Sequence, residues 1–289
     1  MLLQVIASLP FVNEVSMPRP SGSMHPLIIL TSLFLAASGA ARTLAHDTWV
    51  QTATNCVRPN DVVHVDFCLG NHGNDHRDFK LASKLSSMEG AVIEVRSPSG
   101  KRTDLMPTLV DLGYAPKEGY YSGRFKPAEA GLHCIAHTLD KLHRTTRAVK
   151  SSKAYFLVAE KLDAVGAPTK EHATPLGHPL EFVLETHPVI GCGPGKPITV
   201  QLLFKGKPLA DQVVSFIPRG ATLAAGFDPE FERKTDAEGR CSYTPKEGNF
   251  VLVVTHLVKP EEKGEGFEKT AYAATLVLDV PARCACCEE

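Results

Sequence analysis

The sequence predicts an all-β protein with two tandem immunoglobulin-like or transthyretin-like β-sandwich domains after a signal peptide. Three observations indicate this fold class. Short segments of alternating apolar and polar residues recur along the chain, and glycine, proline, serine and aspartate separate them. No amphipathic helical stretch of convincing length interrupts them. The length of 289 residues suits one large or two small domains.

Residues 1–45 have the pattern of an N-terminal extension followed by an export signal. An apolar run from Leu27 to Ala37 precedes small residues, and Thr43 and Ala45 form a small-x-small cleavage site. His46 would then be the first mature residue. The run is short for a bilayer span, and no later segment reaches about 18 apolar residues. We therefore expect an exported protein, periplasmic or on the cell surface, without a membrane span. An uncleaved N-terminal anchor is the alternative.

The first predicted sandwich covers residues 46–160. The segment DVVHVDFCL alternates, so that Val63, Val65 and Phe67 share one face of a strand. The segment AVIEVRSPSGKRTDL contains two strands around a Ser-Pro-Ser-Gly turn, which predicts a hairpin. The segments YYSGRFKPAEAGLHCIAHT and SKAYFLVAE complete this half.

Residues 161–176 are polar and contain proline and glycine, which is typical of a linker. The second predicted sandwich covers residues 177–281, and residues 282–289 form a cysteine-rich tail. Glu181 and Glu185 share one face of the strand LEFVLET, where we expect surface charge. The remaining predicted strands are KPITVQLLFKG, QVVSFIPRG, RCSYTPKEG, NFVLVVTHLV and YAATLVLDV.

The two halves contain similar segments. RFKPAEAGLHCIAH in the first half and SYTPKEGNFVLVVTH in the second each have an aromatic residue, Pro, Glu and Gly before an alternating strand. In the second half, GKPLADQVVSFIPRG and TDAEGRCSYTPKEGNFVLVV resemble a transthyretin-like or carboxypeptidase-regulatory-like sandwich. Asp236 and Gly239 have a turn role there, since Asp bonds the backbone that follows it and Gly accepts a positive φ.

The order of these features resembles a bacterial exported family. A signal ending before AHDTW, an N-terminal β-domain, and a C-terminal sandwich with GKPLA and TDAEGR are similar to the domain-of-unknown-function family 4198. This family was once labelled a nickel-uptake substrate-specific component. The resemblance implies an exported protein linked to transition-metal uptake. Because the sequence lacks a transporter's membrane segments, it implies capture or delivery of the metal.

Histidine is the residue type that points to metal chemistry. Eleven of the 12 histidines lie in the predicted mature chain, and seven of these lie between His46 and His143. Imidazole is the commonest side-chain ligand for nickel, copper and zinc. Cleavage after Ala45 would let His46 chelate an ion through its α-amino and ring nitrogens. A second histidine would complete an arrangement like the histidine brace of copper proteins.

Three further histidines are candidate ligands. His72 and His76 lie in GNHGNDHRD, which we expect to be a loop that can converge ligands, with a solvated polar turn as the alternative. His133 and His137 share a strand face but stand about 13 Å apart, so that at most one joins a given site. We expect His137, near the end of its strand, to be the ligand and His133 to pack. The more scattered histidines are expected to be structural: His172, His178, His187 and His256.

Two neighbours of His46 have expected roles. Asp47 would orient a metal ligand from outside the coordination sphere. Trp49, the one tryptophan, would anchor the first strand in the core and present His46 at the sheet's edge. The cysteine tail would bind a soft metal such as copper(I) or zinc, or form a disulfide staple, through Cys284, Cys286 and Cys287.

The predicted function is non-enzymatic binding of a divalent transition metal of the nickel, copper, cobalt or zinc class. The partners would be the metal ion and, through delivery, a membrane transporter or a surface protein. The net charge of −1 gives no footprint for nucleic acid. The alternatives are a metal-free extracellular module that binds a protein or glycan and, third, a copper oxidase-like enzyme with a histidine brace. The nucleophile-elbow, phosphate-loop and zinc-protease motifs are absent from the sequence.

Overall fold

A computed structural model describes residues 46–73, 76–162 and 170–282. Within these ranges the regular elements are β-strands and two short 3-10 helices, so the all-β prediction is confirmed. The predicted signal peptide, residues 163–169 of the predicted linker and the three tail cysteines Cys284, Cys286 and Cys287 lie outside the described residues. No helix in the described ranges is long and apolar enough to cross a membrane.

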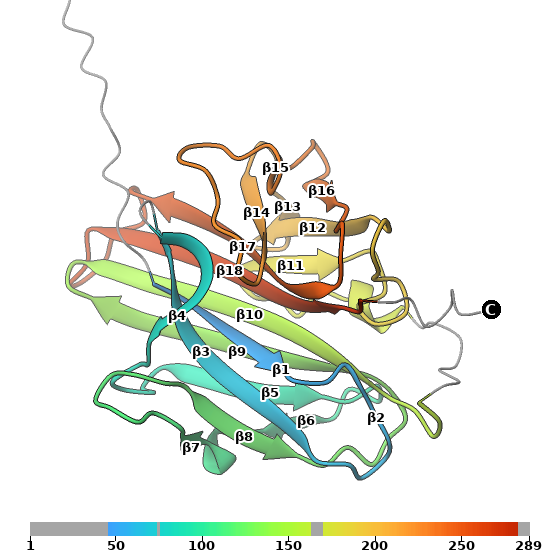
Figure 1. The fold of residues 1–289 in the computed structure, drawn as a ribbon. Helices are drawn as coiled ribbons and strands as arrows, with labels where there is room; N and C mark the ends of the chain where they lie inside the picture. The colour runs from blue at the N-terminus through green and yellow to red at the C-terminus, as the bar shows by residue number, and fades with distance from the viewer. Residues whose placement is uncertain (1–45, 74–75, 163–169, 283–289) are drawn as a thin grey trace, which may run out of the picture. The chain divides into compact units, whose positions relative to one another are not determined.

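Three sheets make up the described fold, and we name them the N-terminal, shared and C-terminal sheets (Figure 1). The N-terminal sheet has five strands: β1 (His46–Thr52), β3 (Val63–Gly73), β8 (Tyr121–Phe125), β7 (Val110–Asp111) and, beside β3, β4 (His76–Ser83). The C-terminal sheet has four strands: β11 (Leu180–Leu184), β12 (Ile198–Phe204), β13 (Lys207–Pro208) and, beside β12, β16 (Arg240–Tyr243).

The shared sheet has nine strands and takes them from both predicted domains. Eight follow one another in space: β15 (Glu232–Lys234), β14 (Val213–Pro218), β17 (Asn249–Lys259), β18 (Lys269–Val280), β10 (Thr146–Val158), β9 (Gly131–His143), β5 (Ala91–Arg96) and β6 (Arg102–Asp104). The ninth, β2 (Cys56–Val57), pairs with the end of β10. The 3-10 helices are η1 (Met106–Thr108) and η2 (Glu171–Ala173).

The predicted boundary at 161–176 falls between β10 and β11, yet strands from its two sides lie in one sheet. β10 pairs in parallel with β18, from Thr146 opposite Lys269 to Lys153 opposite Leu276. The two halves therefore have separate outer sheets and one sheet in common. The described residues accordingly form one compact unit.

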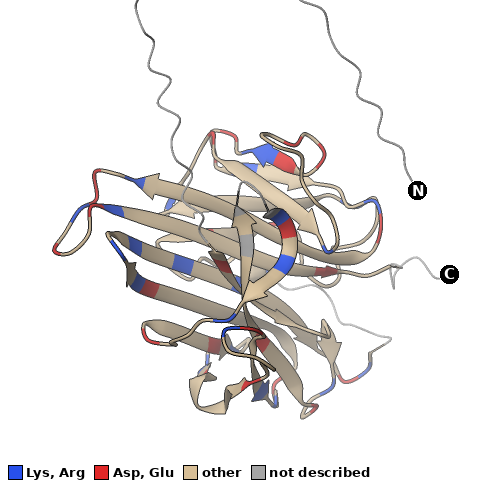
Figure 2. Cartoon of the chain, turned by 60° about the vertical axis from the view of Figure 1, so that its left-hand side comes forward, with Lys and Arg blue, Asp and Glu red and all other residues tan. Residues whose placement is uncertain are grey.

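Both faces of the shared sheet are buried. On β10, Tyr155 and Leu157 belong to the core under the C-terminal sheet, whereas Phe156 and Val158 belong to the core under the N-terminal sheet. Successive side chains of a strand point to opposite faces, so a strand covered on both sides needs apolar residues at every position. This requirement explains the unbroken apolar run at the end of β10. Charged residues of both signs are interspersed over the outer strands and loops (Figure 2).

Two predicted turns have the expected geometry. In the β5–β6 hairpin, the Gly100 amide donates to the Ser97 carbonyl over 2.8 Å, and Gly100 has a φ of 83°. In the TDAEGR turn, Asp236 accepts hydrogen bonds from the amides of Glu238 at 3.0 Å and Arg240 at 2.7 Å. Gly239 follows with a φ of 74°. The turn role of Asp236 and Gly239 is therefore confirmed.

Glu181 corrects the expectation of surface charge on β11. Its side chain is 1% exposed and forms an ion pair of 2.7 Å with Lys153 of β10, which is 2% exposed. Lys153 also donates to the Phe182 carbonyl over 2.8 Å. Burial alone would raise the pKa of Glu181, but the charge and hydrogen bond of Lys153 bring the pKa below its usual value. The pair links the shared and C-terminal sheets.

Two histidines of the interior have pKa values far below the free value of 6.5. Burial lowers the pKa of His137 on β9 to about 3, although its bond to the Val92 carbonyl opposes this. Burial and the neighbouring His172 lower the pKa of His187 to about 4. Both imidazoles are therefore neutral in the native protein at physiological pH.

We predict that Glu181→Gln lowers the free energy of unfolding by about 3 kcal/mol at neutral pH, because Lys153 is left buried without its counter-charge. The matched control is Glu185→Gln. Glu185 pairs with Arg240 at 2.6 Å, but both side chains are more than a third exposed, so about 1 kcal/mol or less is expected. Urea unfolding monitored by circular dichroism measures both. Equal effects would contradict the prediction.

Stability should also fall as the solution is acidified from about pH 7 to about pH 5. The folded-state pKa values of His137 and His187 lie below 6.5, so the unfolded chain binds protons first. Their stabilisation is complete above the unfolded pKa and is lost as pH falls below it. Each should cost about 2 kcal/mol over this interval. Urea midpoints at the two pH values test this, and an unchanged midpoint would refute it.

Candidate functional site

The first strand, β1, is part of the N-terminal sheet and packs on the shared sheet. β1 runs antiparallel to β3, with Asp47 opposite Gly70. On its other side, the Val50 amide donates to the Ser152 hydroxyl of β10 over 3.0 Å. Trp49 is 2% exposed, which confirms the predicted anchor. A Cβ on Gly70 would lie 2.3 Å from the Trp49 ring, so only glycine lets the indole lie there.

Asp47 is a wholly buried carboxylate with a histidine partner from the second half of the chain. Its Oδ1 lies 2.7 Å from Nε2 of His256 on β17. Its Oδ2 is buried and has no hydrogen-bond partner among the described residues. Burial alone would raise the pKa of Asp47, but the charge and hydrogen bond of His256, with smaller contributions from His72 and Lys150, bring it below the usual value.

His72 extends this pair into a cluster, which we name the Asp47–His72–His256 cluster. Its ring stacks on that of His256 with centroids 5.5 Å apart and an interplanar angle of 22°. Because His72 lies two residues beyond Gly70, it shares a sheet face with Asp47. Its Nδ1 is buried and unpartnered within the described part of the chain. Burial, reinforced by His256, lowers the pKa of His72 to about 4.

A buried ion pair fixes the hairpin that carries His72. Arg77 lies opposite His72 in the β3–β4 pairing and forms an ion pair with Glu232 at the start of β15. Glu232 also accepts hydrogen bonds of 2.7 Å from the Ser215 hydroxyl and the Asp228 amide. These contacts join the N-terminal hairpin to the shared sheet, so the position of His72 over His256 is set by the tertiary fold.

His46 lies beside the cluster at the start of β1. Its side chain is exposed, and strand alternation directs it to the face opposite Asp47. Its carbonyl accepts a hydrogen bond from Lys150 of β10. Burial and the Lys150 charge lower the pKa of His46. Asp47, expected to orient a ligand such as His46, bonds to His256 instead.

His137 lies in the middle of its strand, because β9 continues to His143; the expectation of a strand end was wrong. Its Nε2 lies 3.0 Å from the Thr48 hydroxyl and its Nδ1 lies 3.0 Å from the Val92 carbonyl. Both ring nitrogens are engaged, so neither is available to a metal in this arrangement. His133 stacks on Phe156 at 4.9 Å, in agreement with its expected packing role.

His76 begins β4 opposite Gly73. The expected loop around His72 and His76 is instead the end of β3 and the start of β4, with residues 74–75 outside the described ranges. Among the residues that the structure describes, no three His, Cys, Asp or Glu side chains lie where they could hold a metal ion together. The five described cysteines are free thiols: Cys56, Cys68, Cys134, Cys192 and Cys241.

His256 is the residue that sequence reasoning missed. It lies 209 residues from Asp47 along the chain, and nothing in its local sequence marks it. The only usable signal is its place on the strand NFVLVVTHLV, where a polar residue follows a run of apolar ones. A polar residue on such a strand needs an interior partner or a position at the end of the covered sheet.

Solved structures resemble this chain only distantly. The D0-D1 domain of intimin has 10% identity and a TM-score of 0.21, with 81% of this chain and 98% of that one covered. A mutant Salmonella alpha-2-macroglobulin has 14% identity and a TM-score of 0.26, with 81% and 15% covered. The Escherichia coli adhesin FdeC has 10% identity and a TM-score of 0.24, with 82% and 65% covered. Likeness at this level carries no argument about function.

No curated protein matches the chain. One family model does match, the "Domain of unknown function (DUF4198)", and it aligns with residues 43–258. The match begins just before β1 and ends within β17, so that it includes Asp47, His72 and His256. It spans well over half of the sequence and agrees with the resemblance inferred from AHDTW, GKPLA and TDAEGR. The chain belongs to the DUF4198 family.

Proposed function

We propose that this protein is exported and binds a divalent transition metal, of the nickel, copper, cobalt or zinc class, for capture or delivery. The ligands we assign are Asp47, His72 and His256. The observation that carries the proposal is the pair of unpartnered buried atoms, Asp47 Oδ2 and His72 Nδ1, on two residues that both contact His256. Buried polar atoms normally have partners, so two in one cluster favour a missing ligand.

The donor set has the chemistry that such a metal needs. A carboxylate and two imidazoles are common ligands of nickel, copper and zinc. Because the pKa of His72 is about 4, this imidazole is neutral at physiological pH and keeps a nitrogen lone pair for a metal. Asp47, whose pKa lies below its usual value, is ionised. A divalent cation would also compensate the charge of this buried carboxylate.

Binding requires a rearrangement of side chains. Nε2 of His256 and Oδ1 of Asp47, now 2.7 Å apart, would exchange their hydrogen bond for bonds to the ion. Nε2 of His256 would give up the proton that it shares with Asp47, which goes to solvent if the ring carries two protons and to the ring's own Nδ1 if it carries one. His256 is on the solvent side, since its side chain is 31% exposed and that of Asp47 is 1% exposed. An ion would therefore enter past His256.

His256→Gln should weaken metal affinity by more than about tenfold, because it removes an imidazole from the ligand set. Asp47→Asn should do the same, since it removes the charge at nearly constant shape. Calorimetric titration of the purified protein with nickel, copper(II) and zinc measures these changes.

The matched control is His64→Gln, because His64 is exposed on β3 and lies outside the cluster. This variant should leave the affinity unchanged. Tight binding that survives both cluster variants but is lost when Cys284, Cys286 and Cys287 are replaced would move the site to the tail. The absence of binding by the original protein would favour a metal-free interaction module.

Export makes a separate prediction about the mature N-terminus. Cleavage between Ala45 and His46 should give a protein whose first residue is His46, at the start of β1. Intact-mass spectrometry of protein recovered from the periplasm or culture medium of a bacterial host checks this. A mature chain that starts elsewhere removes the amino-terminal chelate of the histidine brace but leaves the Asp47–His72–His256 cluster intact. Retention of the uncut chain in the cytoplasm would contradict export.

A further inference from the structure

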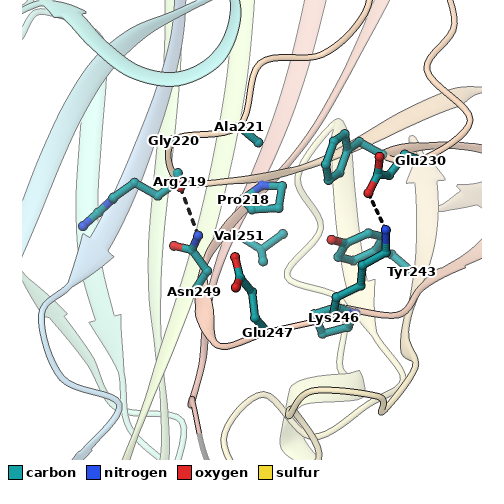
Figure 3. A pocket seen from close by; sticks show the side chains of 12 residues that line it. Pro218, Arg219, Gly220, Ala221, Glu230, Tyr243, Lys246, Glu247, Asn249 and Val251 are labelled. Atoms are coloured by element: carbon teal, nitrogen blue, oxygen red, sulfur yellow. Dashed lines mark hydrogen bonds and ion pairs between the residues drawn. The ribbon is translucent and has the colours of Figure 1, made fainter.

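A pocket of about 520 Å³ opens at the other end of β17, away from the histidine cluster (Figure 3). Its apolar floor is formed by Pro218 at the end of β14, Val251 on β17 and Phe231. Its polar rim includes Tyr243, at the end of β16, and the turn TPKEGN that leads into β17. The turn TPKEGN, which precedes β17 in the sequence, thus forms one wall of the pocket.

Backbone contacts hold this pocket in shape. The Arg219 amide donates to the Phe250 carbonyl over 2.8 Å, and the Asn249 side-chain amide donates to the Arg219 carbonyl over 3.0 Å. On the opposite wall, the Pro245 carbonyl accepts from the Gly195 amide over 2.8 Å. Gly248 packs so closely on Ala282 that a Cβ would lie 2.1 Å from its backbone. A ligand would therefore find a preformed site.

Four charged side chains line the pocket: Arg219, Glu230, Lys246 and Glu247. Lys246 and Glu230 neutralise each other in an ion pair of 2.7 Å. The Arg219 guanidinium points out of the pocket (Figure 3). It lies over the Phe250 ring, 4.4 Å from the ring centroid. Within the described residues, the Glu247 carboxylate has no ion-pair partner and the Tyr243 hydroxyl has no hydrogen-bond partner. Because Arg219 points away, Glu247 is the lining carboxylate that meets the pocket without a paired cation.

We propose that this pocket binds a cationic group on an aliphatic stem, an alkylammonium or alkylguanidinium, as presented by a lysine or arginine side chain of a partner protein. The stem would lie on Pro218, Val251 and Phe231. The cationic head would lie between the Glu247 carboxylate and the Tyr243 hydroxyl, which face the space before Val251 from opposite sides (Figure 3).

Electrostatics and shape favour this ligand class over others. An anion would meet the unpaired Glu247, while Lys246 is paired with Glu230 and the Arg219 guanidinium points away from the pocket. Burial raises the pKa of Tyr243, and the carboxylates of Glu230 and Glu247 add to this rise, while Arg233 opposes it. A sugar would find no free aromatic face to stack on at Tyr243. Phe216 stacks on this ring with centroids 5.1 Å apart, and the Arg233 guanidinium lies 5.9 Å from its centroid.

The proposal is independent of metal binding. Asn249 and His256 are seven residues apart on β17, which is about 23 Å along a strand. Free polyamines also carry a cationic head on an aliphatic stem. The test therefore titrates amino-acid amides and a diamine separately, to distinguish a partner protein from a free polyamine.

The test is a titration of isotopically labelled protein, followed by the amide signals of Gly220, Ala221, Gly248 and Asn249. The ligands are Nα-acetyl-lysine methylamide, Nα-acetyl-arginine methylamide and 1,5-diaminopentane. We expect saturable shifts with the amino-acid amides. Saturation by the diamine alone would overturn the protein-partner source. The same lysine amide acetylated at Nε, which is neutral, should give no saturable shift.

Glu247→Gln should weaken binding of the lysine amide about fivefold, and high salt should do the same. Tyr243→Phe should weaken binding while keeping the ring in place. The matched control Glu265→Gln alters an exposed carboxylate on the β17–β18 loop and should change nothing. Equal shifts with the acetylated ligand, or undiminished affinity in Glu247→Gln, would overturn the proposal.

Discussion

The parallel pairing of β10 with β18 is the constraint on which the rest of the structure depends. It joins strands from the two halves of the chain and leaves both faces of the shared sheet covered. Polar groups on β10 must then find partners in the interior, because water is excluded. They do so alternately: the Ser152 hydroxyl accepts from the Val50 amide of β1, while Ser151 donates to the Leu180 carbonyl and Lys153 pairs with Glu181. The polar positions of β10 thereby connect the shared sheet to both outer sheets.

The Asp47–His72–His256 cluster follows from the same constraint. β1 lies between β3 and the shared sheet, so the Asp47 side chain is buried and must find its partner on a neighbouring strand. That partner is His256. The buried pair of Arg77 and Glu232 brings the β3–β4 hairpin over the same point of the sheet and places His72 on the His256 ring. A carboxylate and two imidazoles, contributed by β1, β3 and β17, are therefore collected by tertiary structure.

The sequence was sufficient for what depends on short-range pattern. Alternation predicted the strands, the turn residues of RSPSGK and TDAEGR predicted two turns, and Trp49 was identified as buried. Pairing between distant strands leaves no such local pattern, and for this reason the shared sheet was not foreseen. The same limit applies to the site. His72 and Asp47 were found because they lie near His46 in a histidine-rich region, whereas His256 was found only from the fold. The expectation for Glu181 was wrong because the sequence pattern of an alternating strand does not show whether a charged side chain faces water or a buried partner such as Lys153.

β17 connects the two proposed sites and also keeps them apart. It pairs with β18 along its whole length and with β14 at Val251 to Val254, between the pocket and His256. Coupling between the two sites would require β17 to slide along its neighbours, which would break its hydrogen bonds to both β14 and β18. A slide of one residue would also turn the apolar side chains of β17 to the opposite face of the sheet. Local rearrangement of His256 requires only a side-chain rotation. The two sites should therefore bind their ligands without coupling, so that this protein could hold a metal at one end of the strand while a partner protein is held at the other.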